Sequence, residues 1–301
     1  MHETIIIGGG IAGDTAAIYA ARKKMDFLMI AKELGGQFFE SGEITNYPGI
    51  VKTDGENFSE SFEDQLEANG IEPRTGEEVT KLEKTGESFK VVTDKGTYET
   101  ATVIIATGSR PRKLEVPGED EFAKKGVTYC SVCDGPLFSG KDVVIAGGGN
   151  SALEAVDFMR EIAEKITLVN NAEQLNGHEY LIDKAESLEK TEIINSAEIV
   201  SIEGDKMVNA VRLKKDGQES KIETEGVIIE IGRKPNTDFL KDFLELDEKG
   251  HIKIDCQGRT SVEGVFAAGD CASGQEFQYV IAAGQGCMAL LKAARYLARR
   301  K

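Results

Sequence analysis

The stretch Thr4-Ile5-Ile6-Ile7-Gly8-Gly9-Gly10-Ile11-Ala12-Gly13 lies at the start of the chain and predicts its fold. An apolar run leads into closely spaced glycines, an alanine-rich helical pattern continues to about residue 24, and a second apolar run follows at residues 27–30. This order of strand, glycine turn, helix and strand is typical of a dinucleotide-binding unit. Gly8 allows the tight turn, Gly10 lets a pyrophosphate approach the backbone, and Gly13 lets the helix and strand pack closely. The first N–H groups of the helix would then face the phosphates.

The same pattern occurs a second time. An apolar strand at residues 142–146 is followed by Gly147-Gly148-Gly149-Asn150-Ser151-Ala152, a helix to about residue 162 and a strand at 165–169. Ala152 replaces the third glycine, which the fingerprint tolerates. The chain therefore predicts an α/β fold with two Rossmann-like, three-layer dinucleotide-binding domains, the second inserted in the first.

Prolines and a glycine between residues 110 and 118 break the pattern and indicate a domain boundary. We expect one domain at residues 1–113 with 243–301 and a second at 114–242. The remaining predicted elements are a helix at about 58–69, a strand meander within 78–100, a strand at 101–106, a second meander at 193–223, a strand at 226–231 and a helix at 280–299.

The overall charge limits the kinds of partner. The 301 residues carry 36 basic and 52 acidic side chains, a formal net charge of −16, so nucleic acid and anionic membranes are not expected partners. No run reaches the roughly 18 apolar residues of a membrane span. The five cysteines are an odd number and only two are close in sequence, which is unlike a secreted disulfide framework. We expect a cytoplasmic chain with one redox pair.

That pair lies in Cys130-Ser131-Val132-Cys133-Asp134-Gly135, between the two glycine turns. Two thiols separated by two residues can close a small disulfide, and Asp134 could serve as a proton donor or acceptor. A structural disulfide, half of a zinc site and a turn-capping role for Asp134 are the alternatives. Zinc would need two more ligands, and the other cysteines and the histidines are scattered, so we expect no metal site.

A further acid follows a strand-end glycine in Gly269-Asp270. A carboxylate at this place could hold a ribityl or ribose hydroxyl, and a helix N-cap is the alternative. The first glycine turn, the cysteine pair, the second glycine turn and this acid therefore follow one another in this order along the chain.

In that order the chain resembles the low-molecular-weight thioredoxin reductases, which are FAD-dependent pyridine nucleotide-disulfide oxidoreductases. The resemblance covers essentially the whole length and rests on residues 8–13, Gly35-Gly36-Gln37, Asn46-Tyr47-Pro48-Gly49, Ala106-Thr107-Gly108, 130–135, 147–152 and Gly269-Asp270. Residues 127–138 and 148–151 are also similar to the C-terminal part of the alkyl hydroperoxide reductase flavoprotein subunit. That subunit has an additional thioredoxin-like region, and this chain starts at the first glycine turn. We therefore expect the disulfide carrier to be a separate protein.

The resemblance implies a set of roles. Cys133 would be the flavin-facing thiol, Cys130 the thiol that attacks the partner's disulfide, and Asp134 the acid/base. The partner would be a thioredoxin-like or glutaredoxin-like protein, and the chain would form a homodimer. The residues implied in FAD binding are Gly8, Gly10, Ile11, Ala12, Gly13, Gly36, Gln37, Asn46, Val79, Ala106, Gly108, Gly269, Asp270, Gln278 and Tyr279. The residues implied in binding the nicotinamide nucleotide are Gly147, Gly149, Asn150 and Ser151.

Two positions depart from the family pattern. NADPH-using members have a cationic run where this chain has Asn170, Asn171, Ala172 and Asn176, so no cation is left for a 2′-phosphate. NADH is therefore the expected donor, although the acid that binds its ribose diol is replaced by Asn170. Reduced ferredoxin delivering electrons to FAD is the next alternative, and NADPH is the least favoured. The second departure is Phe277, where the family commonly has a basic residue.

Three functional hypotheses follow from this pattern. The first is an enzyme that passes electrons through FAD and Cys130–Cys133 to a protein disulfide. The second, of another class, is a non-catalytic flavin and dithiol redox sensor. A ferredoxin-NADP-type reductase shares the two-domain plan but does not use a CxxC pair, so a Cys133 substitution separates it from the first.

Overall fold

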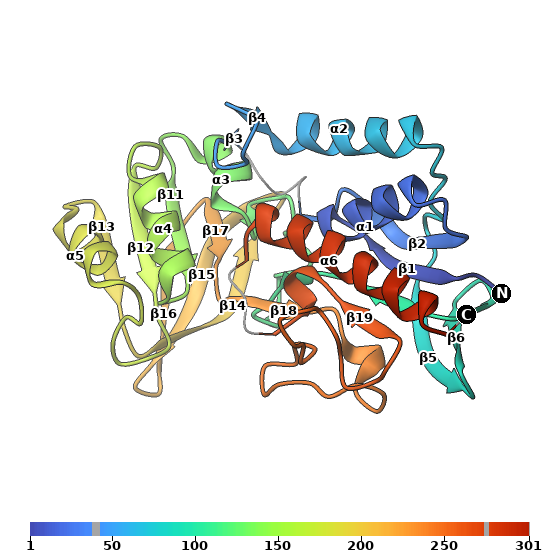
Figure 1. The fold of residues 1–301 in the computed structure, drawn as a ribbon. Coiled ribbons are helices and arrows are strands. Elements are labelled where there is room, and N and C mark those ends of the chain that lie inside the picture. The colour runs from blue at the N-terminus through green and yellow to red at the C-terminus, as the bar shows by residue number, and fades with distance from the viewer. Residues whose placement is uncertain (38–42, 274–276, 301) are drawn as a thin grey trace. The chain divides into compact units, whose positions relative to one another are not determined.

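The computed structural model describes residues 1–37, 43–273 and 277–300 (Figure 1). The chain divides into two compact units, which we describe separately. The first unit comprises Met1–Arg110 with Lys234–Lys301, and the second comprises Pro111–Arg233. Within the described residues, no helix has both the length and the apolar content that crossing a membrane requires.

The first unit is built on a parallel sheet of four strands in the order β19-β8-β1-β2. The strands are β1 (Thr4–Gly9), β2 (Phe27–Leu34), β8 (Val103–Ile105) and β19 (Val265–Ala267). Ile6 pairs with Met29 on one side and with Ile104 on the other. Since both faces of the sheet are covered, the strands read as continuous apolar runs rather than as alternating ones.

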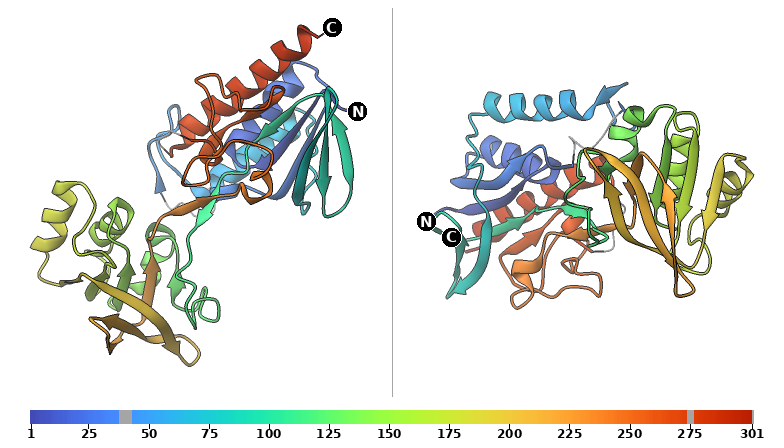
Figure 2. Two further views of the ribbon diagram at one scale, coloured as in Figure 1. Left: turned by 90° about the horizontal axis from the view of Figure 1, so that it is seen from below. Right: turned by 180° about the vertical axis from the view of Figure 1, so that it is seen from behind.

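Side chains alternate between the two faces of this sheet. Ile6 and Ile104 pack with apolar residues of α1 (Ile11–Arg22), α2 (Gly55–Ala68) and α6 (Tyr279–Ala298). Ile5 and Ile7 pack on the opposite face with the antiparallel meander β5 (Val79–Thr85), β6 (Ser88–Thr93) and β7 (Thr97–Thr100). Helices, sheet and meander form three layers, as Figure 2 shows from two sides. The predicted meander at residues 78–100 is confirmed.

The second unit has a parallel sheet of five strands in the order β10-β17-β11-β12-β13. One face packs against α4 (Asn150–Met159) and α5 (Glu179–Ser187), and the other against β14 (Ala197–Gly204), β15 (Val208–Lys215) and β16 (Gln218–Glu223). The strands of the sheet are β10 (Val127–Thr128), β11 (Asp142–Ala146), β12 (Lys165–Val169), β13 (Thr191–Ile194) and β17 (Gly226–Ile229). The α/β prediction with two three-layer units is confirmed.

The chain passes between the units at two neighbouring places. β9 (Ser109–Pro111) pairs with β18 (Arg233–Pro235) in a two-stranded sheet. The predicted domain ranges differ from the compact units here, because residues 234–242 were expected in the second domain. The single turn η3 (Asp238–Leu240) instead places Leu240, which is fully buried, in the apolar cluster beneath the first sheet.

Five further short elements are present in the described residues. They are β3 (Glu43–Ile44) and β4 (Thr53–Asp54), which pair with each other, the single-turn helix α3 (Ser131–Asp134), and the single turns η2 (Gly135–Phe138) and η4 (Gly269–Cys271). The sequence did not predict α5 or β13, although both extend the second unit at one edge of its sheet.

Candidate active site

The first glycine turn is shaped by close backbone contacts. Gly8 has a φ of +120°, and a Cβ there would lie 2.1 Å from the Ala106 carbonyl oxygen. A Cβ on Gly13 would lie 2.0 Å from the Gly8 carbonyl oxygen. These positions therefore need glycine so that β1, α1 and the end of β8 can touch, because a side chain would force the backbones apart.

Gly10 differs from its neighbours because the space beside it is open. The nearest atom to a Cβ on Gly10 would be the Gly36 Cα at 3.9 Å. Gly10 is also the N-cap of α1 and offers no side-chain hydrogen bond to the first turn. The first N–H groups of the helix, which lack intrahelical partners, are thus free to hold an anion. The residues of this turn fit the diphosphate of a dinucleotide.

A hydrogen-bonded group joins three distant segments of the first unit. Gln37 Nε2 donates to Asp270 Oδ2 at 2.7 Å and to Ser109 Oγ at 3.2 Å. The N-cap of η4 is Ala268, so Asp270 does not have the N-cap role that was its alternative. Gly108, with a φ of +63°, has the Gln37 amide 4.0 Å from the position of an added Cβ. Polar groups from the segment after β2, the start of β9 and η4 thereby converge.

Three more of the predicted residues form hydrogen bonds in the same unit. Asn46 Nδ2 donates to Gln278 Oε1 at 3.3 Å, and the Tyr279 hydroxyl donates to the Gln37 carbonyl oxygen at 3.3 Å. Val79 lies apart from this hydrogen-bonded group. It is 8% exposed and packs in the apolar cluster beneath the sheet.

Sequence reasoning missed Ser109 and Asn236 in this unit. Asn236 Nδ2 donates to the Thr107 carbonyl oxygen at 2.9 Å, and the Thr107 hydroxyl donates to the Asn236 carbonyl oxygen at 2.8 Å. No local pattern marks Asn236, because its partner lies 129 residues earlier in the chain.

The redox pair lies in the second unit and is oxidised. Cys130 and Cys133 form a disulfide at the start of the single-turn helix α3 (Ser131–Asp134), and Cys130 Sγ accepts a hydrogen bond from the Cys133 N–H at 3.1 Å. A Cβ on Gly135 would lie 2.9 Å from both Met159 Sδ and Phe158 Cε1. The glycine after the pair therefore lets this segment pack directly on α4.

Asp134 is half-buried and is held by a residue that the sequence did not single out. The Thr128 hydroxyl donates to Asp134 Oδ2 and accepts a hydrogen bond from the Cys130 N–H at 3.2 Å. Thr128 thus links the carboxylate to the first cysteine. Val132 and Leu137, which flank the disulfide in sequence, are 39% and 69% exposed.

The second glycine turn repeats the features of the first. A Cβ on Gly147 would lie 2.3 Å from the Glu230 carbonyl oxygen, whereas one on Gly149 would have nothing closer than the Asn176 carbonyl oxygen at 3.9 Å. Gly149 is the N-cap of α4 and provides no side-chain cap. Asn150 Oδ1 accepts a hydrogen bond from the His178 N–H at 2.7 Å, and Ser151 is exposed on the first turn. This turn also fits a phosphate group.

Asn170 is a structural residue of that turn. It is 3% exposed, and its Nδ2 group donates to the carbonyl oxygens of Ala172 and Gln174 and to Asn195 Oδ1. Its Oδ1 accepts a hydrogen bond from the Ala172 N–H at 3.2 Å. Because both ends of the amide are engaged, Asn170 holds the loop together.

Two other predictions concern metals and Phe277. Within the residues that the structure describes, no three His, Cys, Asp or Glu side chains lie together as metal ligands would. Phe277 is 49% exposed, and its ring stacks on His251 with centroids 5.8 Å apart.

The arrangement is that of an enzyme with two nucleotide turns and one dithiol. The sequence profile described as "Pyridine nucleotide-disulphide oxidoreductase" matches residues 2–287. The chain belongs to this family. The disulfide in the same unit as the second nucleotide turn is the feature that the family's description leads one to expect.

Solved thioredoxin reductases share the fold over their whole length. The Lactococcus lactis enzyme, in its FR conformation, has a TM-score of 0.85 and 34% identity, covering 99% of this chain and 100% of that one. The thioredoxin reductase of T. acidophilum has a TM-score of 0.81 and 38% identity, covering 100% and 99%. The chain is an oxidoreductase of the thioredoxin reductase type.

Curated relatives are longer than this chain. The F component of alkyl hydroperoxide reductase from Staphylococcus aureus (strain MSSA476) is 39% identical over 301 residues, which is 99% of this chain and 59% of that protein. A protein named NADH dehydrogenase from Bacillus subtilis (strain 168) is 38% identical over 300 residues, again 99% and 59%. The chain thus spans somewhat more than half the length of these relatives.

Proposed function

We propose that the chain reduces the disulfide of a thioredoxin-like or glutaredoxin-like protein, with FAD as its cofactor. The observation that carries this proposal is the Cys130–Cys133 disulfide with Asp134 beside it, in a chain that has two open glycine turns. Bound FAD, once an external donor has reduced it, would supply two electrons to this disulfide, which is the redox chemistry that the side chains lack.

The first unit would hold the flavin nucleotide. The first turn of α1, entered through Gly10, would hold its diphosphate, and Asp270, positioned by Gln37, would accept hydrogen bonds from its ribityl hydroxyls. Asn46, Gln278 and Tyr279 would line the flavin side, and Gly36, Ala106 and Gly108 would enclose the cofactor. For Val79 we propose a contact of its backbone with the adenine, because its side chain is buried in the core.

The dithiol step follows from thiol chemistry. The Cys130 thiolate attacks one sulfur of the partner's disulfide, so that a mixed disulfide forms and the partner's second sulfur leaves as a thiolate. Cys133 then attacks Cys130 Sγ, which restores the Cys130–Cys133 disulfide and releases the partner as a dithiol. Two electrons leave the chain, and each departing thiolate takes one proton. Asp134, within one hydroxyl of Cys130, is the proposed donor and acceptor of these protons.

One substitution tests these roles. Cys130→Ser should leave reduction of the flavin intact and abolish turnover with thioredoxin or with the disulfide dye DTNB, because the attacking thiol is gone. Cys256→Ser, at an exposed cysteine outside the pair, is the matched control and should retain full turnover. Turnover by the Cys130→Ser variant would remove the assignment, and activity that survives Cys133→Ser would indicate a ferredoxin-NADP-type reductase.

For the electron donor we propose NADH. Residues 170–180 contain two glutamates and no lysine or arginine, so a 2′-phosphate would meet repulsion and no cation. A relative with 38% identity is named NADH dehydrogenase. The open turn at Gly149 and the uncapped start of α4 support a nucleotide at this place. Reduced ferredoxin is the second candidate because it would need no nucleotide contact.

The donor can be identified by mixing the yellow protein anaerobically with NADH, NADPH or reduced ferredoxin. Bleaching of the flavin by NADH, much faster than by NADPH, supports the proposal. Bleaching by ferredoxin alone would replace it. If a donor reduces the flavin and the dithiol once, without steady turnover of a disulfide substrate, the chain is a redox sensor rather than an enzyme.

For the assembly we propose a cytoplasmic homodimer. Tyr19, Val280 and Met288 are 39%, 45% and 37% exposed on α1 and α6, which pack against each other. These side chains offer an apolar surface that a second copy would cover. Sedimentation should give twice the chain's mass of 32.6 kDa, and a monomer at micromolar concentration would contradict the proposal.

A further inference from the structure

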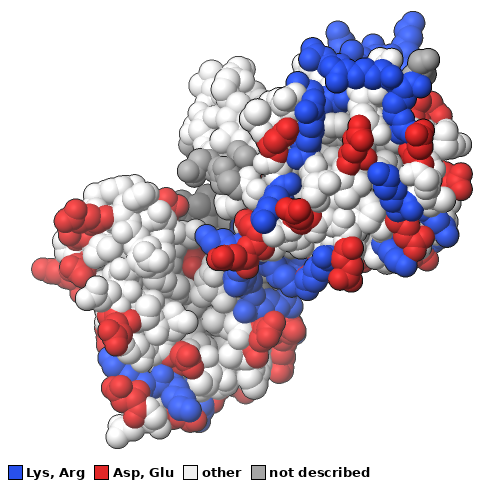
Figure 3. Space-filling model, turned by 60° about the horizontal axis from the view of Figure 1, so that its bottom comes forward, with Lys and Arg blue, Asp and Glu red and all other residues white. Residues whose placement is uncertain are grey.

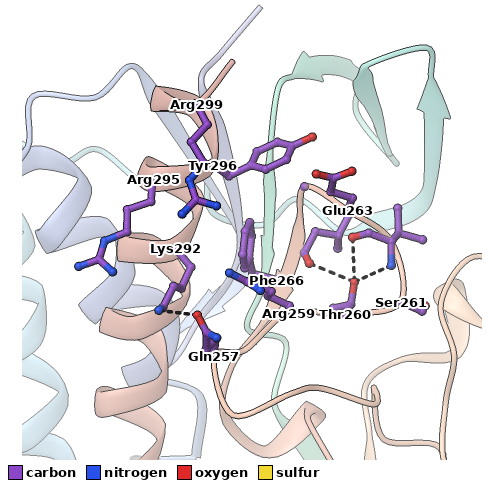
Figure 4. A pocket seen from close by; sticks show the side chains of 13 residues that line it. Gln257, Arg259, Thr260, Ser261, Glu263, Phe266, Lys292, Arg295, Tyr296 and Arg299 are labelled. Atoms are coloured by element: carbon purple, nitrogen blue, oxygen red, sulfur yellow. Dashed lines mark hydrogen bonds between the residues drawn. The ribbon is translucent and has the colours of Figure 1, made fainter. Parts of the chain in front are cut away.

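A cavity of about 400 Å³ in the first unit has no part in the proposed reaction. It lies between the C-terminal half of α6 and the loop that leads into β19 (Figure 4). Lys292 and Arg295 extend from α6, Arg299 follows directly after the helix, and Arg259 extends from the loop. Figure 3 shows Lys and Arg side chains gathered at the end of this unit where the chain terminates.

The four cations of the cavity are close together, and within the part of the chain that the structure describes none of them forms an ion pair. The chain has 52 acidic and 36 basic residues, and elsewhere one acid often holds several cations, as Asp238 does with Arg110, Lys234 and Lys241. Among the described residues, none of the four cavity cations has a carboxylate oxygen within 4.0 Å. Lys292 Nζ donates instead to Gln257 Oε1 at 2.6 Å.

The walls of the cavity are fixed by hydrogen bonds. Asp255 Oδ1 accepts from the Gln257 and Arg259 N–H groups at 2.8 and 3.0 Å. The Thr260 hydroxyl donates to the Val265 carbonyl oxygen at 3.0 Å. On the helix side, Arg300 Nη1 donates to the Tyr296 hydroxyl at 3.0 Å. A cavity with both walls held in place would lose little entropy when a ligand enters.

A purely structural role accounts for only part of this charge. The C-terminus of a helix carries about half a negative charge, which basic residues in the last turn offset. The lining contains four cations and one acid, Glu263, which leaves three positive charges. The excess is several times larger than the helix end requires. It therefore points to a ligand.

We propose that this cavity binds a small multivalent anion, with phosphate or carboxylate groups held by Arg259, Lys292 and Arg299. Its volume is in the range of small-molecule sites. The planar guanidinium groups match both phosphate and carboxylate oxygens in bidentate geometry. Of the two aromatic rings that line the cavity, Phe266 is 3% exposed, and the guanidinium of Arg300 lies over the Tyr296 ring at 5.2 Å from its centroid. The proposal is independent of the disulfide chemistry.

Calorimetric titration of the flavin-loaded protein with tripolyphosphate and with citrate, at low ionic strength, tests the proposal. Saturable binding of tripolyphosphate alone assigns the phosphate class, and binding of citrate alone assigns the carboxylate class. The double variant Arg259→Gln with Arg299→Gln should weaken binding about tenfold for each lost arginine. The control Lys214→Gln with Lys215→Gln removes the same charge from exposed positions of β15 and should bind normally.

Two outcomes would overturn the proposal: no binding of either anion, or equal weakening in both double variants, which would indicate the overall charge rather than a site. A measurement on the unsubstituted protein guards against misfolding of a variant. Tripolyphosphate or citrate should protect Arg259 and Arg299 from phenylglyoxal, while Arg22 at the end of α1 stays reactive. Equal labelling of all three arginines with and without anion would contradict the site.

Discussion

Asp14 is an acid in the interior of the first unit. It lies in the first turn of α1, is 2% exposed, and its Oδ1 atom has no hydrogen-bond partner within the described structure. Burial, together with the smaller effect of the nearby charge of Glu63 on α2, raises its pKa from 3.8 to about 8. At neutral pH the carboxyl group is therefore mainly protonated.

The pKa of Asp14 predicts that stability falls as the pH rises from about 4 to about 8. Because the pKa of Asp14 is higher in the folded than in the unfolded state, protonation of its carboxyl group stabilises the fold. This contribution to the free energy of unfolding is complete below about pH 4 and is lost as the pH rises through about 8. Each pKa unit corresponds to about 1.4 kcal/mol, so the loss over this window is on the order of 5 kcal/mol. Asp14→Asn should remove it, and the melting temperature of the variant should exceed that of the parent at pH 8 but not at pH 4.

The control for this measurement is Asp64→Asn, at an exposed position of α2. It should keep the same pH profile as the parent, since the side chain of Asp64 lies in solvent. If Asp14→Asn and Asp64→Asn give the same profile, the carboxyl group of Asp14 is not the source of the loss of stability between pH 4 and pH 8.

At the second nucleotide turn, Asn171 and Ala172 are exposed beside the buried Asn170. Arginines at these two positions can therefore extend without disturbing the loop, and they would offer the 2′-phosphate charge-assisted hydrogen bonds. The double variant Asn171→Arg with Ala172→Arg should lower KM for NADPH by about tenfold or more and change KM for NADH little. Steady-state kinetics with both nucleotides measures this, and an unchanged ratio would mean that no nicotinamide nucleotide binds here.

The residues of the site differ in how far sequence could identify them. Gly8, Gly10 and Gly13 follow from their spacing, because the turn is local. Gln37 and Asp270 are 233 residues apart, and only the resemblance to a known family named both. No sequence pattern marks Thr128 as a site residue. Its hydroxyl reaches Asp134 and the Cys130 N–H only because of the positions at which β10 ends and α3 begins. Asn170 was named, but its buried, fully bonded amide could not be anticipated from its type.

At the scale of elements, the turn between β1 and α1 needs glycine for two different reasons: open space at Gly10 and close backbone packing at Gly13. Gly10→Ala adds a Cβ with no atom closer than 3.9 Å, at an ordinary φ of −105°, so folding should be preserved. The methyl group would occupy the space proposed for the diphosphate, so FAD affinity should fall by about tenfold or more. Gly13→Ala would bring its Cβ to 2.0 Å from a carbonyl oxygen and should lower the melting temperature markedly.

Flavin content and thermal melts of the two variants, each loaded with excess FAD and then gel-filtered, check this distinction. A Gly10→Ala protein that keeps its full flavin content would show that the open space is not where the diphosphate lies. A Gly13→Ala protein as stable as the parent would show that β1 and α1 can separate without cost.

Strong periodicity made most elements predictable. The apolar strand at residues 165–169 was predicted with its observed bounds, and the predicted C-terminal helix at 280–299 agrees with α6 within one residue at each end. α5 was missed because only Leu181 and Ala185 are buried along its nine residues, so its apolar stripe is short. The chain at residues 234–242 was assigned to the wrong compact unit, since the burial of Leu240 depends on a partner sheet far away in sequence.

At the scale of the molecule, the two units have separate cores. The first unit has one apolar cluster on the helix side of its sheet and one on the meander side, and neither contains a residue between 111 and 233. The two apolar clusters of the second unit contain no residue outside that range. Each unit therefore buries its own apolar surface without the other.

The second unit should consequently fold alone. Residues 111–233, expressed as a fragment, should give a single cooperative thermal transition and the far-ultraviolet signal of an α/β protein, because the fragment is continuous and contains both of its clusters. A fragment with the same range but with Ile145→Asp, which places a charge at a fully buried position, should not fold. A molten or aggregated parent fragment would mean that its core depends on the first unit.

The pairing of β9 with β18, clasped by Thr107 and Asn236, has an evolutionary consequence. Where a chain leaves one domain and returns to it at neighbouring positions, as here, the inserted domain can be gained or lost in a single genetic event. The remaining domain's ends would stay near enough for a short turn to bridge them. An ancestor holding only the larger module could thus have acquired its thiol-bearing half without redesigning the rest.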